Sequence, residues 1–224
     1  MIHGVTVHHL LRSCRVGNIM RSPSLLVIVV AALPLCAQTV PDEVKLENPQ
    51  VRVVQMTVNP HSQSAIRTHK TNRVMIYSDG GHVQISGGDG RIEDLDVPEG
   101  DARWSRAGEP YIMENLTDHP IRIVEIELKA GAGGHAAVSK MDPAAVDSRH
   151  YNMEFENDQV RVLRVHFGAH EKGGLHEHVL DRVVVYLTDQ ASTKAGSVRM
   201  AGSATHTEEN AGDEPAELIA VELK

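Results

Sequence analysis

The hydrophobic positions of this chain fall in short runs of Val, Ile and Leu that are separated by turn residues. After residue 40, no stretch keeps an i, i+3, i+4, i+7 apolar stripe for three turns, so the pattern argues against long amphipathic helices. Many short strands with frequent turns are typical of barrels and jelly rolls, and the chain is predicted to be all-β. The clearest runs are VRVVQMTV (51–58), RVMIYS (73–78), IRIVEIEL (121–128), VRVLRVHF (160–167), RVVVYL (182–187) and AELIAVEL (216–223).

The runs belong to two copies of one pattern. ENPQVRVV at 47–54 matches ENDQVRVL at 156–163 with an offset of 109. The same offset relates residues 61–77 to residues 170–186. NLTDHPIRIVEIELK at 115–129 matches NAGDEPAELIAVELK at 210–224 with an offset of 95. Such self-similarity indicates a duplicated unit, with a first repeat at 44–129 and a second at 151–224.

The change of offset means that the second repeat has lost 14 residues, between Tyr186 and Thr193. In the first repeat this region reads SDGGHVQISGGDGRIEDLDV, with short alternating segments around Gly-Gly-Asp-Gly. That pattern predicts a β-hairpin. The second barrel should therefore lack one hairpin of the first. Residues 130–150, which include AGAGGHAAVSKMDPAA, are predicted to form a Gly/Ala-rich linker.

Three histidines form a candidate metal site. His176 and His178 lead directly into the run at 182–187, and residues two apart on a strand face the same side. A third ligand has to come from a neighbouring strand, and His206 is the candidate. Three neutral imidazoles suit one divalent transition metal and do not distinguish Fe, Zn, Ni, Cu, Co or Mn. A coordination position would remain open for water or substrate. No organic cofactor is predicted.

These residues resemble the two sequence motifs of the cupins. The resemblance covers about residues 44–129 and 151–224, and the segment 100–115 of the first repeat matches the second motif's spacing without a gap. It implies a bicupin, with two cupin-type β-barrels (a jelly-roll-like double-stranded β-helix) whose exposed edge strands are expected to pair with each other. The residues that carry it in the second repeat are Gly173, Gly174, His176 and His178 for the first motif, and Gly196, Gly202, His206 and Asn210 for the second, which is one residue short between Gly196 and His206.

The first repeat departs from the motif at its ligand positions, which hold Arg67, His69 and Tyr111. We therefore expect no metal there, and a role in burying surface or binding an anion. The family's glutamate ligand is replaced by Arg73 in one repeat and Arg182 in the other, and arginine has no acceptor for a metal. Three-His sites occur in the thiol dioxygenases and some relatives within the family, so the loss of this glutamate does not exclude a metal in the second repeat.

Two further residues are candidates for catalytic roles. Glu208 lies two residues beyond His206 and is expected to share its face, as a reserve ligand or general base. Arg182, if it points inward, would add to the positive charge of the metal and favour an anionic substrate. The alternative is that Arg182 pairs with a carboxylate across the barrel. His170 is matched by His61 in the first repeat, which indicates a structural or surface role.

The resulting functional hypothesis is a metal-dependent enzyme acting on a small, anionic organic molecule. The resemblance favours a dioxygenase-like oxidoreductase over an isomerase. The alternative is a non-catalytic cupin that binds a small ligand or serves as an interaction module. Fold alone does not decide between them.

The N-terminal segment reads as an export signal. Residues 1–37 contain three arginines and no acidic residue, and the apolar run 25–37 (LLVIVVAALPLCA) is shorter than the roughly 20 residues that span a bilayer. Met20 would begin a better-proportioned leader than Met1, so residues 1–19 are expected to be untranslated. A cleaved leader implies a periplasmic or secreted protein. A buried core segment, or a lipid anchor on Cys36, are the alternatives.

The composition and charge of the chain limit the kinds of molecule that it is expected to bind. The net charge is -8 and becomes about -11 without the leader, and no Lys/Arg cluster is interleaved with aromatic residues, which argues against a nucleic-acid surface. The expected partner is a small molecule. No stable membrane span is expected once the leader is removed. The sequence is compatible with a monomer or a homodimer.

Overall fold

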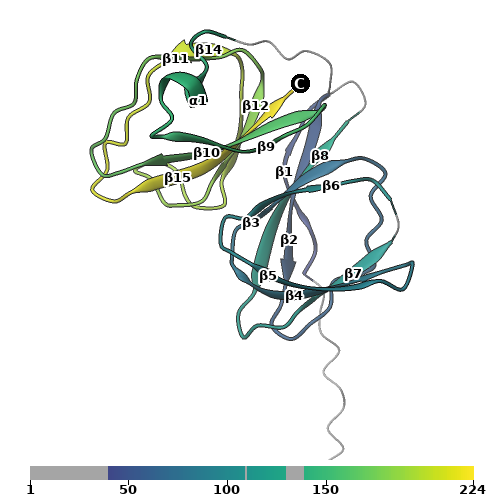
Figure 1. The fold of residues 1–224 in the computed structure, drawn as a ribbon. Coiled ribbons are helices and arrows are strands. Elements are labelled where there is room, and N and C mark those ends of the chain that lie inside the picture. The colour runs from purple at the N-terminus through teal and green to yellow at the C-terminus, as the bar shows by residue number, and fades with distance from the viewer. Residues whose placement is uncertain (1–39, 109, 130–138) are drawn as a thin grey trace, which may run out of the picture. The chain divides into compact units, whose positions relative to one another are not determined.

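The computed structural model describes residues 40–108, 110–129 and 139–224 (Figure 1). The predicted leader at 1–37 lies outside them. Strands account for nearly all of the regular structure, as the apolar pattern predicts, and α1 (Pro143–Val146) is the one α-helix in the described ranges. Nothing helical in this part of the chain is long or apolar enough to cross a bilayer.

The first barrel is built from two antiparallel sheets. One has five strands in the order β1-β2-β8-β3-β6, and the other has three in the order β5-β4-β7. The central pair β2 and β8 is in register over eight residues, from Val51 opposite Leu128 to Val58 opposite Ile121. The strands are β1 (Glu43–Glu47), β2 (Val51–Val58), β3 (Arg73–Tyr77), β4 (Gly81–Gly87), β5 (Ile92–Val97), β6 (Ala102–Ser105), β7 (Tyr111–Asn115) and β8 (Ile121–Leu128).

The second barrel repeats this topology with fewer strands. Its large sheet has the order β13-β12-β15-β10-β9, the counterpart of the first, and its small sheet is reduced to the pair β11-β14. The strands are β9 (Tyr151–Glu156), β10 (Val160–Phe167), β11 (His176–His178), β12 (Arg182–Tyr186), β13 (Val198–Ala201), β14 (Ala204–His206) and β15 (Ala216–Leu223).

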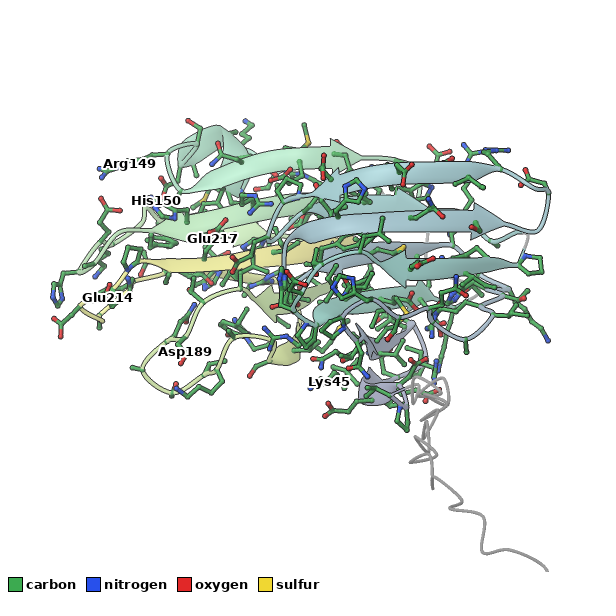
Figure 2. All side chains as sticks on the ribbon, turned by 90° about the horizontal axis from the view of Figure 1, so that it is seen from below. Lys45, Arg149, His150, Asp189, Glu214 and Glu217 are labelled. Atoms are coloured by element: carbon green, nitrogen blue, oxygen red, sulfur yellow. The ribbon has the colours of Figure 1, made fainter. Side chains whose placement is uncertain are left out.

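The missing hairpin is where the repeat offsets place it. In the first barrel β4 and β5 form a hairpin whose turn contains Gly90 at φ 82°, a conformation that favours glycine. In the second barrel a tight turn closed by backbone hydrogen bonds between Gln190 and Thr193 takes its place. Figure 2 labels Asp189 on this short connection. The prediction of a second barrel shortened by a hairpin is confirmed.

Successive side chains of a strand point to opposite faces of its sheet, and in each five-stranded sheet both faces are apolar. One face of both sheets contributes to a single core that includes Val53, Ile126, Val162 and Ile219. The opposite faces look into their own barrels. The expected pairing of edge strands between the barrels is wrong for the described residues, since no ladder joins the two sheets. They pack through apolar side chains instead, which buries far more hydrophobic surface than an edge ladder could.

The predicted linker also differs from expectation in its second half. Residues 130–138 lie outside the described residues, but residues 139–150 are ordered against the second barrel. Asp142 caps α1 by accepting a hydrogen bond from the Ala144 amide, and Pro143 suits the first helical position. Asp142 also forms an ion pair with Arg161 of β10. The composition of 130–145 resembles a linker, whereas the cap and this ion pair fix its end in place.

Candidate metal centre

Two short strands bring the three predicted histidines together. β11 pairs with β14 so that His176 lies directly opposite His206, and His178 lies on the same face of β11 two residues further on. The ring centroids of His176 and His206 are 4.6 Å apart, and those of His176 and His178 are 5.0 Å apart. One ring nitrogen from each of the three histidines lies within 4.8 Å of the other two, so the three nitrogens are close enough to bind one metal ion together.

The hydrogen bonds of His176 and His178 use Nδ1 of each ring and leave Nε2 available for a metal. His176 Nδ1 lies 3.0 Å from the carbonyl oxygen of Gly174, and His178 Nδ1 lies 2.7 Å from Glu222 Oε1. Both partners are acceptors, so each Nδ1 carries the proton and each Nε2 keeps its lone pair. His176 Nε2 is 3.1 Å from His206 Nε2. The donor set therefore fits a metal ion bound by neutral imidazoles.

Burial also favours the neutral form of these imidazole rings. His176 and His178 are almost fully buried and His206 is half-buried. Burial lowers the pKa of His176 and of His206 below the ordinary value for imidazole. At neutral pH the neutral form, which is the one that binds metal, is therefore favoured.

A buried carboxylate orients His178, and the sequence interpretation missed it. Glu222 of β15 is 2% exposed, and its other oxygen faces Arg161 at 3.5 Å. The first barrel holds the same arrangement at matched positions, where Glu127 lies 3.1 Å from both His69 and Arg52. In that pair the hydrogen bond with His69 lowers the pKa of Glu127 to about 2, so the carboxylate is charged.

Glu222→Gln should weaken metal binding by about 10- to 100-fold, because a carboxylate behind a histidine ligand fixes its orientation and raises its basicity. Competition with a chromophoric chelator measures this affinity. Glu127→Gln, the same change in the first barrel, should have no effect and serves as the control. Equal affinities for the Glu222→Gln and wild-type proteins would show that Glu222 does not act on the site.

Tyr151 connects the histidines to Glu208. The buried hydroxyl of Tyr151 lies 3.1 Å from His176 Nε2 and donates to Glu208 Oε2 at 2.5 Å. Burial, and then the nearby charge of Glu208, raise the pKa of Tyr151, so the phenol stays protonated and acts as a donor. Glu208 is not within the three-histidine group, so the structure does not favour it as a reserve ligand. Its place beside Tyr151 suits the other expectation, that of a general base.

Arg182 lies inside the second barrel without a close ion pair. It is 4% exposed, it stands opposite Glu222 in the ladder, and its Nη1 donates to the carbonyl oxygen of Gly202 at 2.7 Å. In the described part of the chain no carboxylate lies within ion-pair distance of Arg182, but Glu208 and Glu222 of the same barrel act on its charge from further away. Burial lowers the pKa of Arg182. A buried guanidinium favours negative charge nearby, and Glu208 and Glu222 supply part of it here.

The first barrel holds an ion network at the place of the metal site. Arg67 stands at the position of His176, and its Nη2 donates to the fully buried Glu125 at 2.9 Å. Arg67 also pairs with Asp42 at 3.0 Å, and Tyr111 and Arg73 lie near the other oxygen of Glu125. Arg67 therefore has two carboxylate partners already, so of the two roles expected for this barrel, burying surface and binding an anion, the network favours the first. His69, Glu125 and Glu127 are close enough to share an ion, but Arg67 lies against Glu125 and opposes a second cation.

His61 and His170, at matched positions of the two repeats, have similar surroundings. His61 and His170 both have positive φ, 48° and 57°, and both lie within hydrogen-bond distance of an aspartate on an exposed loop, Asp118 and Asp213. Neither is part of the metal centre. Their structural role is the one that the matched positions predict.

Comparison with known proteins identifies the fold. No protein-family model and no curated protein matches this chain. Among solved structures, AerE from Microcystis aeruginosa is 10% identical, covers 82% of this chain and 97% of its own, and has a TM-score of 0.58. A cupin 2 conserved barrel domain protein from Leptotrichia buccalis is 16% identical, covers 84% of this chain and 90% of its own, and has a TM-score of 0.53.

An oxalate decarboxylase variant from Bacillus subtilis is also similar, with 14% identity and a TM-score of 0.57, over 81% of this chain and 74% of its own. Identities this low show the fold alone, and that fold is the cupin barrel. The cupins that are similar to this chain include enzymes, so function has to be argued from the site itself.

Proposed function

We propose that this chain is an exported bicupin enzyme that binds one divalent transition metal in its second barrel and acts on a small, anionic organic molecule. The observation that carries the proposal is the convergence of three imidazoles, two of them with Nδ1 bound to an acceptor, beside a Tyr151–Glu208 hydrogen bond. Export rests on the leader at 1–37 and would be tested by mass spectrometry of the N-terminus of native protein.

The metal would supply Lewis acidity and, where it is redox-active, electron transfer. The protein's own residues bind the substrate and move protons. Glu208 lines a cavity of the second barrel, and Tyr151 holds one of its oxygens. Glu208 can therefore accept a proton from a molecule in that cavity. The buried charge of Arg182 favours an anion in the same barrel.

The reaction class is proposed as a dioxygenase-like oxidation, with isomerisation as the second candidate. Oxygen uptake and product analysis with metal-loaded protein and a panel of small carboxylates distinguish the two. Glu208→Gln should reduce turnover by about 100- to 10,000-fold, the usual contribution of a general base, with unchanged metal content. His206→Ala should remove both the metal and the activity.

The results separate the alternatives. Bound metal and bound carboxylate without any chemical conversion would show a non-catalytic ligand-binding cupin. Turnover by Glu208→Gln at the wild-type rate would show that Glu208 is not the base. Purified protein that takes up no divalent transition metal would overturn the proposal as a whole.

A further inference from the structure

A cavity of the second barrel lies at positions that belong to the apolar core in the first barrel, which has a smaller pocket of about 220 Å³ beside Met56 and Val58. A cavity of about 280 Å³ in the second barrel is lined by residues of β10, β12, β15 and the segment 208–212. Six of these residues occupy the positions of the first barrel's apolar core. In the order of the chain, Val165, Phe167, Tyr186, Glu208, Ala216 and Leu218 match Met56, Val58, Tyr77, Met113, Ile121 and Ile123.

Two kinds of change open this space. Glu208 and Ala216 replace Met113 and Ile121, so a polar side chain and a small one stand where the first barrel has two large apolar ones. The lost hairpin accounts for the rest. Its strands β4 and β5 place Val83 and Val97 in the first barrel's core, and the second barrel has no counterpart to them. The short turn that replaces the hairpin, residues 190–192, lines the cavity instead.

An arginine beside this cavity has lost its counterion. Arg199 of β13 lies opposite Val184 as Arg103 lies opposite Met75, and each guanidinium lies over a tyrosine ring, at 5.9 Å in the second barrel and 5.8 Å in the first. Arg103 donates to Asp101 at 2.5 Å. The residue at the matched position, two before Arg199, is Ser197.

The backbone confirms that Ser197 and Asp101 correspond. The amide of Tyr77 donates to the Asp101 carbonyl at 2.9 Å, and the amide of Tyr186 donates to the Ser197 carbonyl at 3.0 Å. Arg199 keeps a hydrogen bond from its Nε to the Tyr186 hydroxyl, and in the described residues no acidic side chain pairs with it. Its guanidinium is therefore held in place and free to bind an anion.

We propose that this cavity is the substrate cavity of the second barrel, and that it takes a small organic carboxylate whose anionic group is bound by Arg199. Val165, Phe167 and Leu218 would contact the apolar part of the molecule. Glu208 stands on the same cavity wall and connects it through Tyr151 to His176. The volume lies just below the usual range for ligand pockets, which points to a small molecule. This inference rests on the proposed function and specifies its substrate class.

Calorimetric titration with butanoate and phenylacetate, each compared with its uncharged amide, tests the inference on metal-loaded and metal-free protein. The carboxylates should bind more tightly than the amides. Arg199→Gln should weaken carboxylate binding by up to about fivefold, since Arg199 is exposed and solvent screens its interaction with an anion. Ser197→Asp should act in the same direction, because it restores the counterion that neutralises the matched arginine.

Two further variants separate the cavity from general effects. Ala216→Ile should weaken both carboxylates, because it restores the side chain that fills the first barrel. Arg103→Gln should leave binding unchanged. Metal content, measured in every variant, should stay at the wild-type level. Carboxylates that bind no more tightly than amides, or that bind equally well to Arg199→Gln and Ala216→Ile, would overturn the inference. Absence of metal from the wild-type protein would instead defeat the proposed function, while the titration of metal-free protein would still decide the carboxylate site.

Discussion

His176→Ala should leave the protein without bound metal after dialysis, whereas the wild-type chain should retain one divalent ion. The loss should exceed the 10- to 100-fold that follows the loss of a group orienting a ligand, because here a ligand itself is removed. His176 is fully buried, and its Nε2 lies 3.1 Å from that of His206, so the substitution removes a nitrogen from the middle of the three-histidine group. Inductively coupled plasma mass spectrometry of the dialysed protein gives the stoichiometry.

The control in the first barrel is His69→Ala, at the one ligand position where that barrel keeps a histidine (the match of His178), and it should leave the metal content at one ion per chain. His69 shares its surroundings with Glu125, Glu127 and the guanidinium of Arg67, which is already bound to Glu125. Two ions per chain in the wild type, or loss of the metal in His69→Ala, would place a functional site in the first barrel and contradict the assignment.

Much of the fold could be predicted because its signals are local or repeated. Alternation within runs such as 51–58 identifies half-buried strands, and the change of offset from 109 to 95 locates the lost hairpin without any knowledge of tertiary contacts. The three histidines were equally accessible, since spacing of two on a strand puts His176 and His178 on one face. The ladder then places His206 opposite His176.

The groups that tune the site were missed because they come from strands distant in sequence. Glu222 reaches His178 across 44 residues, and Tyr151 reaches Glu208 across 57. One signal was present: Arg161 and Glu222 are identical to Arg52 and Glu127 at matched positions, in repeats that differ at most others. Packing of the two sheets was misjudged for a similar reason, because edge pairing follows from a single strand whereas face-to-face packing depends on both sheets at once.

Glu125→Ala should destabilise the protein by about 3–5 kcal/mol, the usual cost of removing one partner of a buried ion pair. Glu125 is fully buried, and its carboxylate meets Arg67 at 2.9 Å and Arg73 at 3.9 Å. Without it, two guanidiniums stay inside the first barrel, one of them with no other acidic partner in the described residues. Urea denaturation followed by circular dichroism measures the free energy of unfolding. Glu93→Ala, at a carboxylate that is 50% exposed, should change it by less than about 0.5 kcal/mol.

The second barrel supplies the compensating change. The residue matched to Glu125 there is Ala220, and the residue matched to Arg67 is His176, so alanine at this position occurs together with an imidazole. Arg67→His combined with Glu125→Ala copies that pair and should recover much of the lost stability, because it removes the guanidinium that the carboxylate neutralises. Arg73 remains, as Arg182 does in the second barrel, where no carboxylate pairs with it. A double variant as unstable as Glu125→Ala would show that Arg67 is not the charge that makes Glu125 necessary. Glu125→Ala with the stability of Glu93→Ala would show that the buried network contributes nothing to holding the first barrel together.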